Sequence, residues 1–282
     1  MNIKLEEVSF SYNQNEDSPP VLNEICFEIK SGDFVGIVGP TGSGKTSLLE
    51  LICGFLKPFS GKVLFDGIDI YSDKRERMNF RKKISIVFQF PEKQIFEDTV
   101  FEDISFGPKN HGISGESLDK LVRKSLDYVG LEFENVSQKS PFNLSSGEQR
   151  RVAIAGILAF DPDVILLDEP TIAVDFNGLE CIEKIINSVY LKGKTILLVT
   201  HDMDLIAKNV NRIIALKEGG IVYDGDKNNF FKNNELIYDL NLEVPEIIRF
   251  IRKYNLKNLE NVYDIAKIRN ELRNTINSTK FI

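Results

Sequence analysis

The stretch Gly39-Pro40-Thr41-Gly42-Ser43-Gly44-Lys45-Thr46 decides the fold that we expect for this chain. An apolar run, 34–38, precedes it, and residues 47–52 after it have the composition of a helix. The order strand, glycine-rich turn and helix is typical of a P-loop. Glycines let successive backbone N–H groups turn inward around a phosphate, and the positive end of the helix dipole adds to the attraction. The alternative, an ordinary glycine-rich turn, does not account for the flanking strand and helix.

The side chains of this loop have distinct expected roles. Lys45 reaches the β- and γ-phosphates of a nucleotide, and the hydroxyl of Thr46 is a ligand for Mg²⁺. We therefore predict a nucleotide site whose loop residues are Gly39, Pro40, Thr41, Gly42, Ser43, Gly44, Lys45, Thr46 and Ser47. Tyr12, at the end of a predicted strand, is a candidate for stacking on the base, although a structural role fits it equally well.

Two carboxylates follow a second apolar strand. Residues 164–167 are all aliphatic, as in a fully buried parallel strand, and Asp168 and Glu169 come directly after them. Open α/β sheets bind ligands at this end of their strands. Beside a P-loop, Asp168 can hold Mg²⁺ directly or through water, and Glu169 can polarise a water for attack on the γ-phosphate. The alternative is a pair of acidic residues that caps a helix.

Two further predicted strands end in polar residues, which we expect at the same C-terminal edge of the sheet. The apolar run 84–88 ends at Gln89, and the strand 195–200 ends at His201, where the γ-phosphate should lie. Strands are also expected over 3–9, 25–29 and 61–67, and a hairpin over 212–225 with Gly219-Gly220 as its turn.

Helical patterns occupy the rest of the chain. Apolar residues repeat with helical spacing over 117–129, and residues 145–147 precede a helix of small residues at 152–159. A helix end of this kind binds anions. The P-loop already holds the chain's own phosphates, so this second end is unexplained unless it serves a nucleotide on another molecule. Beyond 226, two apolar stripes, 247–251 and 259–272, predict a small helical appendage.

Composition limits the remaining possibilities. The 282 residues carry a net charge of −7, which does not favour nucleic-acid binding, and we interpret the basic cluster at 74–83 as a solvated face. Cys26, Cys53 and Cys181 lack paired spacing, so we expect small core residues in a reducing compartment. No window of the sequence is long and apolar enough to span a bilayer, and we see no signal peptide, so a cytoplasmic protein is expected.

Taken in order, seven motifs resemble those of the ATP-binding cassette (ABC) ATPases. They are the aromatic Tyr12, the Walker A loop 39–46, the Q-loop Gln89, the signature 144–148, Walker B with its glutamate at 164–169, the D-loop Asp175 and the switch histidine His201. The resemblance covers about residues 1–225. It implies an α/β P-loop NTPase fold with a mainly parallel core sheet, an antiparallel β region and a helical insertion at about 90–160. We predict a C-terminal helical extension over 226–282.

The resemblance also implies roles. In this family Thr46 and Gln89 contact Mg²⁺, Asp168 holds it through water, Glu169 is the base and His201 contacts the γ-phosphate. Ser145 and Gly147 of one subunit close over the ATP of the other, so that two ATP molecules lie between two such domains.

Three departures from the family pattern bear on that closure. Ser146 and Glu148 replace a glycine and the glutamine of the signature, and Ala173 stands where the D-loop has glycine. A serine is costly if residue 146 needs a positive φ, and a carboxylate near the γ-phosphate of a partner opposes closure unless Glu148 points away. One composite site of a heterodimer is then weakened. Restoring both signature residues should raise ATPase turnover.

A narrower resemblance, carried by 88–96, 102–110 and 150–156, is to the ATPases of energy-coupling-factor transporters. These power uptake of vitamins and of cobalt or nickel ions, at the cytoplasmic face of the membrane, with a transmembrane coupling protein and a substrate-binding membrane subunit. Coupling helices enter a groove near the Q-loop, for which Phe90, Pro91, Gln94 and Phe96 are our candidates, with core packing of the phenylalanines as the alternative. Other readings are an ATP-binding subunit that seldom hydrolyses and a soluble cassette acting on nucleic acid or ribosomes.

Overall fold

The computed structural model describes all residues except 14–18, 257–258, 260–261, 264–266, 271–272 and 274–282. Its strands are β1 (Ile3–Phe10), β2 (Leu22–Ile29), β3 (Phe34–Val38), β4 (Ser60–Phe65), β5 (Ile68–Asp69), β6 (Ile84–Val87), β7 (Val164–Asp168), β8 (Thr195–Val199), β9 (Arg212–Lys217) and β10 (Gly220–Asp226). Its α-helices are α1 (Lys45–Ile52), α2 (Lys74–Arg81), α3 (Val100–Asn110), α4 (Glu116–Tyr128), α5 (Phe133–Val136), α6 (Ser146–Leu158), α7 (Phe176–Tyr190), α8 (Met203–Asn209), α9 (Lys227–Lys232), α10 (Asn234–Asp239) and α11 (Glu246–Lys253). Short 3₁₀ helices among the described residues include η1 (Pro91–Gln94) and η2 (Pro141–Asn143).

The larger sheet has six strands in the order β10-β9-β3-β8-β7-β6. Five of them run parallel, and β10 pairs antiparallel with β9 at the edge. Every residue of β3, β7 and β8 is buried, because both faces of the sheet are covered, and this explains their unbroken apolar runs. The mainly parallel core sheet that we predicted is confirmed.

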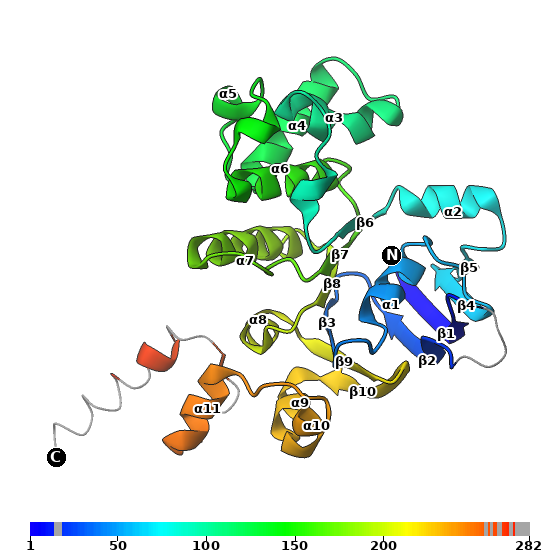
Figure 1. The fold of residues 1–282 in the computed structure, drawn as a ribbon, viewed down its shortest axis with the longest axis vertical. Coiled ribbons are helices and arrows are strands. Elements are labelled where there is room, and N and C mark those ends of the chain that lie inside the picture. The colour runs from blue at the N-terminus through cyan, green and yellow to red at the C-terminus, as the bar shows by residue number, and fades with distance from the viewer. Residues whose placement is uncertain (14–18, 257–258, 260–261, 264–266, 271–272, 274–282) are drawn as a thin grey trace.

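A second, antiparallel sheet has the order β2-β1-β4-β5 and lies beside the first (Figure 1). Its β4–β5 turn, Asp66-Gly67, has φ angles of 47° and 84°, the primed geometry that suits the strand twist. The β9–β10 turn is of the same kind, at Glu218-Gly219 with φ 50° and 78°, one residue before the turn we expected. Strand β2 also begins earlier than expected, at Leu22.

The parallel sheet separates two apolar cores. Alternate residues of β7 point to opposite faces, so that Val164 and Leu166 join α1 and the antiparallel sheet. Ile165 and Leu167 join the helices of the other face. The expectation of three core cysteines is wrong for Cys26, which is exposed because its place in β2 alternates with buried residues.

Helices α3 to α6 form a group set apart from the sheets (Figure 1) and connect β6 to β7. Helix α4 lies within one residue of the predicted 117–129, whereas α3, α7 and α8 were not predicted. The basic cluster belongs to α2, whose Phe80 is buried against Phe65 and whose Arg81 Nη2 donates to the Gly54 carbonyl at 2.6 Å.

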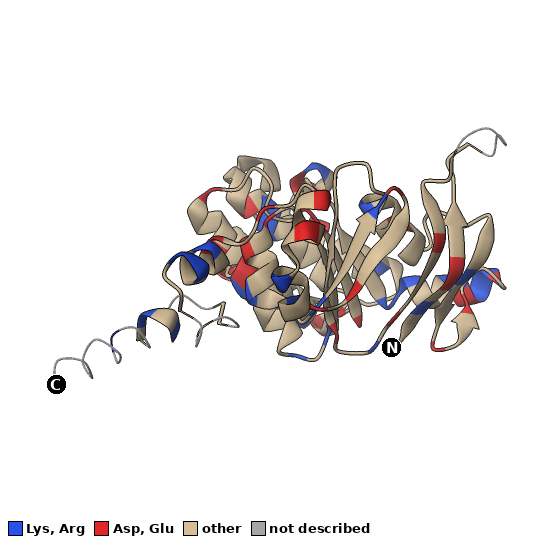
Figure 2. Ribbon diagram, turned by 90° about the horizontal axis from the view of Figure 1, so that it is seen from below, with Lys and Arg blue, Asp and Glu red and all other residues tan. Residues whose placement is uncertain are grey.

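At the C-terminal end, α11 buries Ile248 and Ile251, as its apolar spacing indicated. Leu259 and Ile268 of the second predicted stripe pack with Ile251, while Ile265, Ala266 and Leu272 lie outside the described residues. The proposed division into 1–225 and 226–282 stays a prediction. Figure 2 shows Lys and Arg mixed with Asp and Glu over the strands and helices.

Candidate active site

A cleft of about 500 Å³ opens where the parallel strands end. The C-terminal ends of β3, β7 and β8, which are neighbours in the sheet, lead into the three motifs that face it. Its lining is Val21, Thr41, Gly42, Gly44, Lys45, Thr46, Ser47, Gln89, Asp168, Glu169, Ile172, Val199 and His201. Ten of the predicted site residues, between Thr41 and His201 in the sequence, are therefore gathered in one cleft.

The P-loop takes a shape that only glycine permits at its ends. Gly39 has φ 145°, and a Cβ there would lie 2.1 Å from the Leu216 carbonyl oxygen. Gly44 has φ 100°, and its Cβ would lie 2.7 Å from Leu22 Cδ2. Lys45 Nζ donates to the carbonyls of Gly39 at 2.8 Å and of Pro40 at 3.0 Å, so the ammonium lies within the curl of the loop.

The donor set beside the loop fits Mg²⁺. Thr46 Oγ1 donates to Asp168 Oδ2 at 3.0 Å, which brings together two of the three residues predicted to hold the metal. Burial raises the pKa of Asp168, and the Thr46 hydroxyl and Lys45 oppose this. Within the described ranges there is no cluster of three or more His, Cys, Asp or Glu side chains suited to a metal. One carboxylate and one hydroxyl suffice for Mg²⁺, which keeps several waters and takes phosphate oxygens as ligands.

Glu169 and His201 contact each other in the lining of the cleft. The His201 backbone N–H donates to Glu169 Oε2 at 3.3 Å, and His201 Nε2 lies 3.5 Å from Glu169 Oε1. Oε1 is buried without a hydrogen-bond partner among the described residues, which leaves an acceptor for a water molecule. Burial raises the pKa of Glu169, while His201 opposes the rise. A carboxylate of raised basicity suits a general base.

Gln89 lines the cleft, whereas Tyr12 lies beside the start of α1. The Gln89 backbone oxygen accepts a hydrogen bond from Arg150 Nη2 at 2.7 Å. Tyr12 has 60% of its surface exposed, and its hydroxyl lies 3.0 Å from Ser47 Oγ and 3.3 Å from Glu50 Oε2. These contacts hold the ring beside the start of α1, next to the P-loop.

Seven predicted site residues are not among those that line this cleft: Gly39, Pro40 and Ser43 of the P-loop, Tyr12, Ser145, Gly147 and Asp175. Ser145, Gly147 and Asp175 are exposed and do not line it. Ser145 and Asp175 cap α6 and α7, the latter by accepting from the Gly178 N–H at 2.8 Å. In a single chain the signature and the D-loop therefore face solvent.

The unusual signature residues behave differently from our expectation. Ser146 belongs to α6 and is not among the described residues with positive φ, so serine carries no backbone cost there. Glu148 turns back along α6, where its Oε2 accepts from the Ser145 N–H at 2.9 Å and from the Ser145 hydroxyl at 2.7 Å. These two bonds lower the pKa of Glu148. Ala173, in contrast, does have the left-handed φ of 57°.

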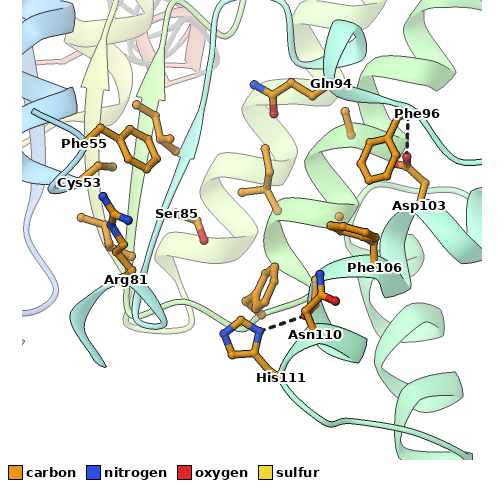
Figure 3. A pocket seen from close by; sticks show the side chains of 17 residues that line it. Cys53, Phe55, Arg81, Ser85, Gln94, Phe96, Asp103, Phe106, Asn110 and His111 are labelled. Atoms are coloured by element: carbon orange, nitrogen blue, oxygen red, sulfur yellow. Dashed lines mark hydrogen bonds between the residues drawn. The ribbon is translucent and has the colours of Figure 1, made fainter. Parts of the chain in front are cut away.

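A second cavity, of about 440 Å³, lies between the sheet and the α3–α6 group (Figure 3). Of the four groove candidates, Gln94 and Phe96 line this cavity, but Phe90 and Pro91 do not, and Pro91 is buried in η1. The other lining residues are Cys53, Phe55, Arg81, Ile84, Ser85, Ile86, Asp103, Phe106, Gly107, Asn110, His111, Ala153, Gly156, Ile157 and Phe160. Residues 102–110 carried the narrower family resemblance but were not predicted to line the groove, to which α3 supplies Asp103, Phe106, Gly107 and Asn110.

Comparison with known proteins agrees with this geometry. The family model described as ABC transporter matches residues 22–172. The energy-coupling factor transporter ATP-binding protein EcfA2 of Clostridium perfringens is 40% identical, over 96% of this chain and 97% of the relative. EcfA2 of Caldanaerobacter subterraneus is 42% identical, over 95% of this chain and 94% of the relative.

Solved structures similar to this chain are also ATP-binding cassettes. One is cbiO1 from Clostridium perfringens, part of the ABC transporter complex cbiONQ, with a TM-score of 0.74 and 35% identity over 89% of this chain and 98% of that one. Another is a dimeric ATP-binding cassette with ADP and phosphate bound, with a TM-score of 0.71 and 34% identity over 79% of this chain and 98% of that one. The fold and the site thus define an ABC-type P-loop ATPase. The chain belongs to the ABC transporter family and, within it, to the energy-coupling factor transporter ATP-binding proteins.

Proposed function

We propose that this protein is the ATP-hydrolysing subunit of an energy-coupling-factor transporter and powers uptake of a vitamin or a transition-metal ion. The observation that carries the proposal is the single cleft that unites the P-loop, the Thr46–Asp168 pair and the buried carboxylate of Glu169. Such a cleft holds a triphosphate and a nucleophilic water together, which is what hydrolysis requires.

The residues of the cleft divide the chemistry among them. Lys45 and the loop N–H groups bind the β- and γ-phosphates, and Glu169 Oε1 accepts the proton of the attacking water. His201, held by Glu169, supplies a hydrogen bond to the γ-phosphate. Thr46, Gln89 and Asp168 are the residues that would hold Mg²⁺, which when bound neutralises charge on the phosphates.

We propose further that two cassettes close around ATP. Ser145, Gly147 and Asp175 are exposed in the single chain, and a Cβ on Gly147 would meet no described residue within 4 Å apart from its chain neighbours and its own helix backbone. These residues are therefore free to meet the nucleotide of a second subunit, identical or related. The dimeric cassette of similar fold supports this arrangement.

The groove in Figure 3 is our candidate for the docking site of the transmembrane coupling protein. Phe55, Phe96 and Phe106 are 53%, 58% and 43% exposed around it, and exposed aromatics of this kind mark protein-binding surfaces. In the parts of the chain that the structure describes, no helix has the length and apolarity to cross a bilayer. We place the protein at the cytoplasmic face of the cell membrane, beside that coupling protein and a substrate-binding membrane subunit.

Phosphate release by the purified protein tests the hydrolytic role. The wild type should release phosphate from Mg-ATP, and Lys45→Ala should lose nucleotide binding. Glu169→Gln should bind ATP but hydrolyse it at least about a hundredfold more slowly, because the general base is gone. The control Glu180→Gln removes a carboxylate from a surface ion pair with Lys184 and should leave the rate unchanged. Equal rates for the two glutamine variants would refute the assignment of the base.

One observation favours a second candidate, an ATP-binding subunit that hydrolyses slowly. The Ser145 hydroxyl, which should meet the γ-phosphate of the partner, is already bonded to the charged Glu148. A wild type that binds Mg-ATP but releases phosphate no faster than Glu169→Gln would support this candidate.

A further inference from the structure

Helix α6 connects the signature to the groove of Figure 3. It begins at the signature, where Ser145 caps it. Three of its later residues, Ala153, Gly156 and Ile157, line the groove of Figure 3. Arg150 lies between these two parts, and its side chain is buried, with 8% of its surface exposed. A buried guanidinium needs partners for its donors, since leaving them unsatisfied is costly.

Arg150 finds those partners on two separate loops. Its Nη2 donates to the Gln89 carbonyl at 2.7 Å, and its Nη1 donates to the Ile172 carbonyl at 2.9 Å. Gln89 and Ile172 both line the nucleotide cleft. One planar side chain therefore fixes the backbone of the Q-loop to the backbone that follows the Walker B strand.

A third contact extends toward the groove. Arg150 Nε lies 3.4 Å from Glu92 Oε2, and neither atom makes a hydrogen bond within the described structure. Glu92 belongs to η1, whose last residue, Gln94, lines the groove. The segment from Gln89 to Gln94 thus runs from the cleft to the groove, and Arg150 contacts it at two points.

We propose that Arg150 is a positioning residue that holds Gln89 in the cleft and links it to the groove. The two short carbonyl bonds fix the Q-loop at Gln89, and the looser Arg150–Glu92 pair is the part that adjusts when η1 moves. The planar guanidinium can donate to two carbonyls at once, which the single ammonium of lysine cannot reproduce in the same geometry. The role of Gln89 in hydrolysis rests on the proposed function, whereas the contact between Arg150 and the Q-loop does not.

The first test needs no nucleotide. The chain contains no tryptophan, so Phe90→Trp places a single fluorescent reporter in the Q-loop. Adding Arg150→Gln should shift its emission to the red and increase quenching by acrylamide, because the loop loses its anchor. Arg151→Gln is the matched control: the neighbouring arginine also donates to backbone carbonyls, those of Val129 and Gly130, but away from both cavities. Equal spectra for the two variants would overturn the proposal.

The second test asks whether Arg150 acts through Gln89. Arg150→Gln should lower the rate of phosphate release about tenfold or more, the usual effect of losing a partner that orients a metal-site residue. In a Gln89→Ala background the same change should have no further effect, since the residue it positions is gone. Arg150→Lys keeps the buried charge but should also slow phosphate release. Melting curves are the control that each variant is folded at the assay temperature.

The outcomes distinguish a failure of the Arg150 inference from a failure of the proposed ATPase function. Additive losses in the double variant would show that Arg150 acts independently of Gln89 and would overturn the inference. A wild type without phosphate release would instead contradict the proposed function, and the fluorescence comparison would still decide whether Arg150 anchors the Q-loop.

Discussion

At the scale of single residues, backbone strain gathers just after β7. Glu169 has φ 49° and Ala173 has φ 57°, although neither is a glycine. Non-glycine residues in this region are disfavoured by about 1–2 kcal/mol. At Glu169 the strain accompanies a hydrogen bond from its N–H to the Val199 carbonyl at 2.9 Å, which aims the carboxylate into the cleft. The strained backbone of Glu169 places a cleft residue, whereas Ala173 does not line the cleft and a glycine there would relieve the strain.

Ala173→Gly should therefore stabilise the fold. Relief of the left-handed strain outweighs the extra flexibility of glycine in the unfolded chain, for a net gain of up to about 1 kcal/mol. Thermal unfolding should show a rise in Tm of about 1–3 °C. In the control, Ala207→Gly, the alanine lies in α8 with no positive φ, so the same exchange should lower Tm. A fall in Tm for both variants would show that the strain at 173 is negligible.

Two substitutions of Tyr12 can distinguish the contribution of its ring to ATP binding from that of its hydroxyl. If the ring stacks on the base, Tyr12→Ala should weaken ATP binding about tenfold, since base–aromatic stacking contributes about 1–3 kcal/mol. Tyr12→Phe keeps the ring and loses only the contacts to Ser47 and Glu50, so its affinity should stay close to wild type. Calorimetry with Mg-ATP on the Glu169→Gln background checks both values. Equal losses for the two variants would mean that the hydroxyl, not the ring, matters.

At the scale of elements, the N-terminus of α6 shows why the signature tolerates a carboxylate. Ser145 and Glu148 form a reciprocal capping box, and such boxes stabilise helix starts. The pattern Ser-x-x-Glu is visible in the sequence, but its consequence, a serine hydroxyl held by an anion, depends on the side-chain geometry. Ser146 takes a helical place in the same turn, so exchange to glycine should cost stability instead of aiding closure.

Glu148→Gln should raise ATPase turnover severalfold. The glutamine oxygen can still accept the Ser145 N–H, while the charge that repels the γ-phosphate of a partner is removed. Because the pKa of Glu148 is lowered from 4.5, the carboxylate stays ionised between about pH 6 and about pH 8, and the gain should be equal at both ends of that range. Glu116→Gln, in the first turn of α4, is the control for charge at a helix start. A gain that vanishes at the higher pH would contradict this account.

Sequence patterns predicted the strands better than the helices. Buried parallel strands appear as unbroken apolar runs, so β3, β7 and β8 were assigned correctly. Helix α7 was missed although its Asp175 cap and the spacing of Ile182, Ile185, Ile186 and Val189 were available. The anchoring of the Q-loop by Arg150 was out of reach, because a buried arginine on a helix has no pattern that identifies its partners.

At the scale of the whole molecule, charge bears on which partner closes over the ATP. Each copy carries a net charge of −7, and two bound nucleotides add negative charge to a pair. Identical copies therefore repel one another at long range, and salt screens repulsion beyond about 10 Å at an ionic strength of about 0.1 M. A related cassette of opposite charge would instead be attracted, and salt would weaken that pairing.

This difference predicts how closure responds to salt. If the partner is a second copy, light scattering of Glu169→Gln with Mg-ATP should show more dimer as the ionic strength rises, because screening reduces the repulsion between like-charged copies. Without nucleotide the protein should stay monomeric at every salt concentration, which controls for aggregation. A protein that binds ATP and remains a monomer throughout would show that the partner is a different cassette. A dimer that weakens as salt rises would mean that complementary local charges, and not the net charge, govern the contact between the two copies.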